Sequence, residues 1–157
     1  MRTVRRNAQK MKYALYLGSV DVVSTDSNGN PHYHEDSEGN RIYIVTGEKR
    51  DIYDIPVEFD ANFSTSGGEA QEQEYGLDIS QFDAVLIYSL KAYPITEGTL
   101  IWKDSEVKYD GENMYFTNDM QTLIEVHSPV KTSADYVVKK VGDSLNYTRV
   151  NVSAINK

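Results

Sequence analysis

Short runs of β-branched and aromatic residues, separated by glycine, asparagine, aspartate and proline, recur along the whole chain and constrain its fold more than any other feature. Twelve tyrosines add to these runs, and stretches with the apolar spacing of a helix are scarce. Such side chains fit the pleated surface of a sheet, while the residues between them favour tight turns. The pattern predicts an all-β fold, a small antiparallel β-barrel or sandwich with long polar loops.

Two runs give the clearest strand predictions. The run Val57–Phe63 alternates apolar and polar residues behind Pro56, which predicts a half-buried strand. Ala84–Tyr88 is continuously apolar and is expected to be covered on both faces. The remaining expectations are strands Met11–Leu17 and Val20–Val23 around a tight turn at Gly18, a short helical turn over Ile79–Phe82 that Asp78 caps, and a final hairpin of Tyr136–Val141 and Tyr147–Ile155.

The charge distribution divides the chain into a basic start and an acidic remainder. The net charge is −8, yet residues 1–12 carry five positive charges and no acid, so the rest carries −13. We expect an extended basic N-terminal arm over 1–12 and a single β-barrel-like domain over 13–157, with loop excursions at 24–41 and 64–75. An acidic body repels duplex DNA, whereas the arm is either a solvated terminus or a docking segment.

Several classes of chemistry are disfavoured. The chain has no cysteine, which excludes disulfides and thiol nucleophiles, and no apolar run approaches the roughly 18 to 20 residues that span a bilayer, so no membrane partner is expected. Neither a phosphate-binding glycine loop before a helix nor a Gly-x-Ser-x-Gly elbow occurs. We therefore expect no enzyme and no cofactor, although a dispersed carboxylate pair of the glycosidase kind stays open.

Two weaker site hypotheses come from histidines and aromatic residues. His32 and His34 are followed by two acids, and His-x-His on a strand directs both imidazoles to one side, as in metal sites. The alternative, polar decoration of a Gly/Asn-rich loop, is favoured, so no metal site is predicted beyond this weak candidate. Surface tyrosines with Trp102 would form a carbohydrate platform, unless the rings are buried in the sheet.

One set of segments resembles a known family. It comprises Pro56–Asn62, Ser66–Ala70, Glu74–Asp78, Phe82–Val85 and Tyr93–Trp102, together with Met1–Asn7, Ser133–Val138 and Asp143–Asn146. These segments resemble the head-closure (stopper, or head-tail joining) proteins of tailed bacteriophages of Gram-positive hosts, over nearly the whole chain.

The resemblance implies a structural protein of the virion neck that is assembled in the host cytoplasm. Such proteins are similar to small β-barrels that form a homo-oligomeric ring between the portal and adaptor above and the tail terminator or tail tube below. Packaged double-stranded DNA passes through the channel, and an acidic lining would let it slide. The alternatives are a tail terminator or another neck component, or a carbohydrate-binding β-sandwich module.

Three groups of residues are expected to make the contacts of such a ring. The docking arm would use Arg2, Arg5, Arg6 and Lys10. Channel or inter-subunit loops would use Gly67, Gly68, Glu69, Glu72 and Glu74. The last strand would pair with a partner by β-augmentation through Tyr147, Arg149 and Asn151.

Overall fold

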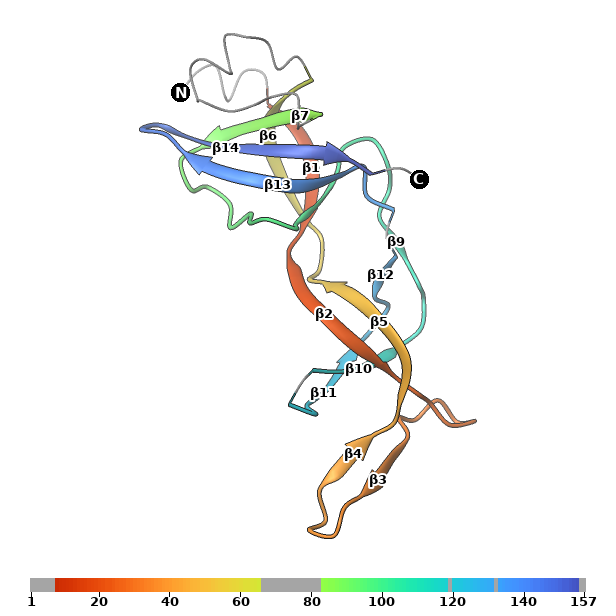
Figure 1. Ribbon diagram of the computed structural model, residues 1–157. Helices are drawn as coiled ribbons and strands as arrows, with labels where there is room; N and C mark the ends of the chain where they lie inside the picture. The colour runs from red at the N-terminus through yellow and green to blue at the C-terminus, as the bar shows by residue number, and fades with distance from the viewer. Residues whose placement is uncertain (1–7, 66–82, 119, 132, 156–157) are drawn as a thin grey trace. The chain divides into compact units, whose positions relative to one another are not determined.

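The computed structural model describes residues 8–65, 83–118, 120–131 and 133–155 (Figure 1). Over these residues the secondary structure consists of strands, with a closed antiparallel barrel and additional sheets, and the all-β prediction is confirmed. No helix in this part of the chain has the length and apolar character to cross a membrane. The predicted helical turn at Asp78–Phe82 lies outside the described residues.

The chain divides into two compact units, where we had expected one domain. The barrel unit comprises Met1–Tyr16, Asp54–Val107 and Thr132–Lys157, and the inserted unit comprises Leu17–Tyr53 and Lys108–Lys131. The inserted unit thus arises from two separate excursions of the barrel chain. The sequence showed no composition shift at these crossings, because each excursion is itself built of strands.

The barrel unit is a closed sheet of six strands. Their order around the barrel is β1 (Gln9–Ala14), β6 (Val57–Ser64), β7 (Ala84–Ser89), β14 (Tyr147–Ala154), β13 (Tyr136–Asp143) and β8 (Leu100–Trp102), which returns to β1. Neighbouring strands are antiparallel, with Met11 opposite Phe59 and Tyr13 opposite both Val57 and Ile101. Closure leaves no free sheet edge.

Side chains from alternate positions fill the barrel. Phe59 and Ala61 are buried as the alternation in β6 predicted, but Val57 at the start of the strand is 47% exposed. Strand β7 is buried over most of its length, as expected from its continuous apolar run. Aromatic rings join this core, with Tyr13 5.3 Å from Phe59 and Tyr93 5.3 Å from Phe59 between ring centroids.

The inserted unit has its own sheet and core. A four-stranded sheet has the order β11 (Leu123–Val126), β10 (Met114–Thr117), β2 (Tyr16–Val23) and β5 (Val45–Tyr53). Val20 of β2, Ile52 of β5 and Phe116 of β10 are buried and form a separate apolar cluster. Two pairs of short strands complete the unit: β9 (Lys108–Tyr109) with β12 (Val130–Lys131), and β3 (Tyr33–Glu35) with β4 (Arg41–Tyr43).

The predicted tight turn at Gly18 is wrong. Gly18 lies within β2, and the chain runs through it in an extended strand from Tyr16 to Val23. Its φ of +125° is readily reached by glycine, so the residue permits an irregularity in the strand without reversing it. The break between strands falls earlier, at Leu15, between β1 and β2.

Three loops of the inserted unit share one turn design. Asp26 Oδ1 accepts hydrogen bonds from the backbone N–H groups of Asn28 and Asn30, and Asp36 Oδ1 does the same for Glu38 and Asn40. The fourth residue of each loop adopts positive φ: Gly29 and Gly39 in these two, and Gln121 in the third, which Asn118 caps. The predicted excursion at 24–41 is therefore an ordered pair of hairpin turns around β3.

Candidate functional site

Most of the residues predicted for the arm and the channel loop lie outside the described residues. These are Arg2, Arg5 and Arg6 of the arm, and Gly67, Gly68, Glu69, Glu72 and Glu74 of the loop. Lys10 is described, but it belongs to β1, where it is exposed and pairs with Asp60 of β6. The basic arm predicted over 1–12 therefore ends before Gln9, because residues 9–12 are part of the barrel wall.

The last strand cannot pair with a partner in the way predicted. Strand β14 is bonded to β13 on one side and to β7 on the other, so its backbone has no free edge. Tyr147 and Arg149 are half-buried, and Asn151 is buried. β-Augmentation needs an unpaired strand, and β14 is an interior strand of the barrel.

His32 and His34 differ in their burial and in their contacts. His32 is half-buried just before β3, with Nδ1 3.1 Å from Ser24 Oγ, while His34 is exposed and lies opposite Ile42. Within the described part of the chain, no three His, Cys, Asp or Glu side chains are grouped closely enough to hold a metal ion. Trp102 is also unsuited to a carbohydrate platform, because it is 2% exposed and donates its indole N–H to Ser133 Oγ at 3.2 Å.

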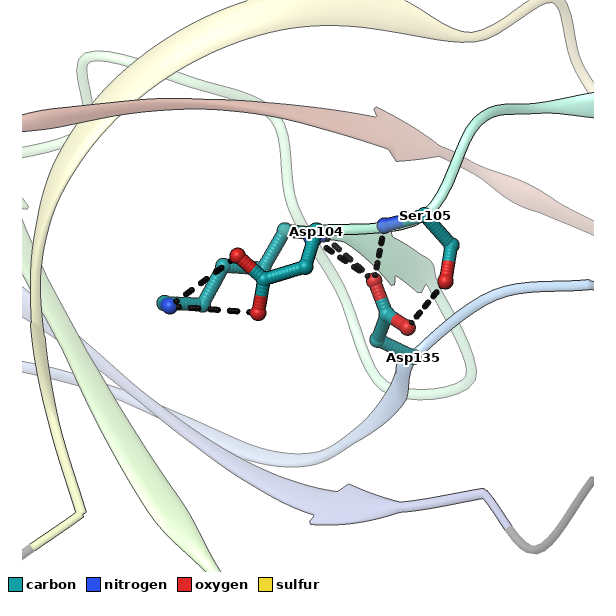
Figure 2. A network of polar contacts seen from close by, with 4 residues as sticks. Asp104, Ser105 and Asp135 are labelled. Carbon is teal, nitrogen blue, oxygen red and sulfur yellow. Dashed lines mark hydrogen bonds and ion pairs between the residues drawn. The ribbon is translucent and has the colours of Figure 1, made fainter.

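Asp135 is the centre of a polar network in the barrel unit (Figure 2). Its Oδ2 accepts hydrogen bonds from the backbone N–H groups of Lys103, Asp104 and Ser105, at 2.9, 3.0 and 3.0 Å. Its Oδ1 accepts the Ser105 hydroxyl at 2.7 Å. One carboxylate thus fixes the segment that leaves β8 against the segment that returns to β13, next to the second crossing into the inserted unit. This geometry indicates an anchor that holds a loop.

A pocket opens at one end of the barrel. It has a volume of about 260 Å³ and is lined by Tyr88, Lys91, Tyr93, Pro94, Ile95, Val141, Asp143 and Thr148. Tyr88 is 1% exposed, and its hydroxyl has no hydrogen-bond partner among the described residues. Burial, together with the nearby Asp143 carboxylate, raises the pKa of Tyr88, so the hydroxyl stays protonated and is available as a donor.

The two charged residues of this pocket are joined through one threonine. The backbone N–H of Lys91 donates to Thr148 Oγ1 at 2.8 Å, and that hydroxyl donates to Asp143 Oδ1 at 2.7 Å. Two exposed apolar residues are close to them in the chain, Leu90 next to Lys91 and Leu145 two residues after Asp143, at 41% and 88% exposure. The pocket lining therefore includes an acidic residue, a lysine and aromatic side chains.

The hairpin of β3 and β4 in the inserted unit carries aromatic and charged side chains on one face. Tyr33 and Tyr43 are opposite each other, with ring centroids 6.0 Å apart, and the Arg41 guanidinium lies 4.4 Å from the centre of the Tyr33 ring. Glu35 is directly opposite Arg41 on the same face, since residues two apart on a strand point the same way. We call these four residues the hairpin face.

The inserted unit also contains a larger open cavity of about 460 Å³, bordered by Thr46, Asp110, Glu112 and Tyr115 among others. Its acidic character is partly neutralised, because the Arg50 guanidinium forms an ion pair with Asp110. The same guanidinium donates to the Val130 carbonyl at 3.2 Å. The Asp110 carboxylate at this cavity thus has a partner within the chain, whereas at the barrel-end pocket no described residue accepts a hydrogen bond from the Tyr88 hydroxyl.

The chain matches no protein-family model, no curated protein and no solved structure. The geometry therefore carries the functional argument. Neither the barrel-end pocket nor the hairpin face was singled out from the sequence. The hairpin face had a usable signal, because Tyr33-x-Glu35 and Arg41-x-Tyr43 flank an Asp-x-x-Gly turn that sets their register.

Proposed function

We propose that the protein is a structural component of a tailed-phage neck, a head-closure or head-to-tail connector. It would form a ring between the portal and adaptor and the tail, and help to retain or gate packaged DNA. A tail terminator or other tail-completion protein is the alternative within the same class. The proposal takes its virion context from the resemblance to head-closure proteins and its mechanical content from the exposed hairpin.

The observation that carries the proposal is that residues 24–44 form an ordered hairpin that lies outside the apolar core and exposes aromatic and charged side chains. It links β2 to β5, yet none of its residues belongs to the apolar cluster around Phe116. A two-stranded hairpin without a core is marginally stable in water. This one is nevertheless held by two aspartate-capped turns, and it exposes Tyr33 and Arg41, residue types that dominate binding interfaces. An ordered, coreless hairpin with such a face is suited to contact another protein.

The charge of the inserted unit supports the DNA-related part of the proposal. Its two segments contain eleven acidic and five basic residues. A ring lined with such a surface repels DNA phosphates and lets the genome pass without adhesion. Closure would then be mechanical, through loops that narrow the channel.

The deciding experiment combines gene deletion with analysis of virions. Deletion is expected to give filled heads that lose DNA and carry no tails, and the protein added back to such heads should restore joining. Mass spectrometry of purified virions should find the chain in ring-like copy number. Infectious, tailed particles after deletion would refute the proposal.

A carbohydrate-binding role is the second candidate, because of the two tyrosine rings on the hairpin face. Aromatic faces stack on sugar rings, and Tyr33 is 42% exposed. Glycan-array binding that disappears in the Tyr33→Ala variant would favour this role over ring assembly.

A further inference from the structure

We propose that the hairpin face of one copy docks into the barrel-end pocket of a second copy of the same chain. The occupying residues are Tyr33, Glu35, Arg41 and Tyr43, and the receiving residues are Tyr88, Lys91, Tyr93 and Asp143. The inference deepens the proposed function, on which its ring interpretation rests, by naming the contact that would link subunits.

The pocket has the size and chemistry of a receptor for side chains. Its 260 Å³ falls below the roughly 300 to 1,000 Å³ of typical small-molecule sites, so it has room for one or two side chains of the hairpin face, and the others would contact its rim. Tyr88 closes the inner wall of the pocket, where it is 1% exposed. Leu90, next to Lys91 in the chain, and Leu145, two residues after Asp143, provide exposed apolar surface. An incoming group with apolar area would cover this surface.

The hairpin face carries the complementary groups. Tyr33 and Tyr43 supply aromatic area for the Tyr93 wall, and the Glu35 carboxylate supplies an acceptor. Tyrosine and arginine are residue types that often dominate the binding energy of protein interfaces.

The charges match in sign. On the hairpin, Glu35 and Arg41 are directly opposite across two strands, which places their Cβ atoms about 4.5 to 5.5 Å apart. In the pocket, Lys91 and Asp143 both belong to the lining, and the Lys91 backbone N–H and the Asp143 carboxylate share the Thr148 hydroxyl through bonds of 2.8 and 2.7 Å. Arg41 would therefore face Asp143 while Glu35 faces Lys91. The reverse orientation would place like charges together, so the pairing also fixes direction.

Two different surfaces of one chain take part, so the contact is heterologous. Each copy has one hairpin face and one pocket, and such contacts continue from copy to copy until they close into a ring or extend as a filament. A stable interface buries at least about 1,200 Å², more than four side chains and one small pocket supply. The contact would act together with other surfaces of the ring, so chemical cross-linking, which captures weak contacts, is the appropriate measurement.

The absence of cysteine from the chain permits a direct test. Purified Ser37→Cys protein, labelled at the hairpin tip, is mixed with Leu145→Cys protein and treated with a bismaleimide, so that a mixed product must join two copies. We expect cross-linked dimer from this mixture. Glu106→Cys in place of Leu145→Cys is the matched control, because Glu106 follows β8, whose Ile101 pairs with the start of β13, away from Asp143 at its end.

Charge reversal then tests the pairing. Glu35→Lys in one protein, or Lys91→Glu in the other, should each lower the mixed yield about tenfold, and combining the two reversals should restore it. Glu48→Lys, an exposed acid on β5 outside the hairpin, should leave the yield unchanged. A yield no higher than with Glu106→Cys, or reversals without rescue, would overturn the inference.

These outcomes are separable from the proposed function. Cross-linking with rescue in a protein that is absent from virions would keep the contact and reject the neck role. Conversely, a protein required for head closure whose hairpin cross-links to a different neck protein would keep the role and reject the self-contact.

Discussion

Replacing Asp135 by alanine should destabilise the barrel unit more than any other change in its polar network. The substitution removes the acceptor for three backbone N–H groups and for the Ser105 hydroxyl at once. Hydrogen bonds to a charged group contribute about 1.5 to 3 kcal/mol each, but a half-exposed loop regains water after the change. We therefore expect a loss of about 2 to 4 kcal/mol in the free energy of unfolding, well below the sum of the four bonds.

The assay uses a built-in reporter. Trp102 is the single tryptophan, is buried in β8, and directly precedes Lys103, the first donor to the network. Urea unfolding followed by its fluorescence therefore reports on the barrel unit. Asp135→Asn should cost less, about 1 to 2 kcal/mol, because the amide oxygen still accepts from the backbone.

Asp104→Ala is the matched control. The Asp104 side chain is 79% exposed and contacts the Lys103 ammonium at 3.3 Å, so its loss should change stability by about 0.5 kcal/mol or less. If the free energies of unfolding of Asp135→Ala and Asp104→Ala differ by less than about 0.5 kcal/mol, the Asp135 carboxylate is not an anchor and the prediction is wrong.

Three further changes test the inserted unit. Backbone hydrogen bonds, the largest from Asn30 and Asn40, lower the pKa of Asp26 and of Asp36. The two turns are therefore stabilised above the ordinary carboxyl pKa, and this stability is lost as the pH falls through the lowered pKa values. The NMR shifts of the turn amides should change over this acidic range, and shifts that stay constant down to about pH 2 would contradict the expectation. Gly39→Ala, at φ +83°, should cost about 1 to 2 kcal/mol and speed amide exchange in β4, with unchanged exchange as the contrary result. Phe116→Ala should lower the free energy of unfolding by about 3 to 5 kcal/mol and make the inserted unit sensitive to proteolysis, whereas Phe116→Leu should have a smaller effect. Equal resistance of the two variants to proteolysis would show that Phe116 is not part of the core of this unit.

The barrel strands could be predicted because each has a local signature. The apolar run of β7, the alternation of β6 and the final hairpin were all found at nearly their observed positions. The strand through Gly18 was missed, because glycine is a turn signal in isolation. In the folded chain β2 is fixed by tertiary pairing with β10 and β5, which overrides the local preference.

The barrel-end pocket could not be predicted from local pattern. Tyr88 and Lys91 come from the end of β7 and the following loop, while Asp143 and Thr148 come from the β13–β14 hairpin more than fifty residues later. Their proximity depends on the pairing of β14 with β7, including Thr148 opposite Tyr88. Such long-range register leaves no spacing signal in the sequence. The burial of the Tyr88 hydroxyl, for which no described residue is a hydrogen-bond partner, likewise follows from closure of the barrel.

The connectivity gives a physical reason for the proposed interaction surface on the inserted unit. The first excursion of the inserted unit leaves the barrel after β1 and returns into β6, and the second leaves after β8 and returns into β13, so each begins and ends at neighbouring strands of the barrel. The first crossing is tied by the Asp54 N–H to the Leu15 carbonyl at 2.8 Å, and the Asp135 network stands beside the second. The barrel strands thus close around their own core, while the inserted segments are long loops in topological terms. Loops on a scaffold are where binding residues are commonly placed, and the proposed docking role of the hairpin face agrees with that rule.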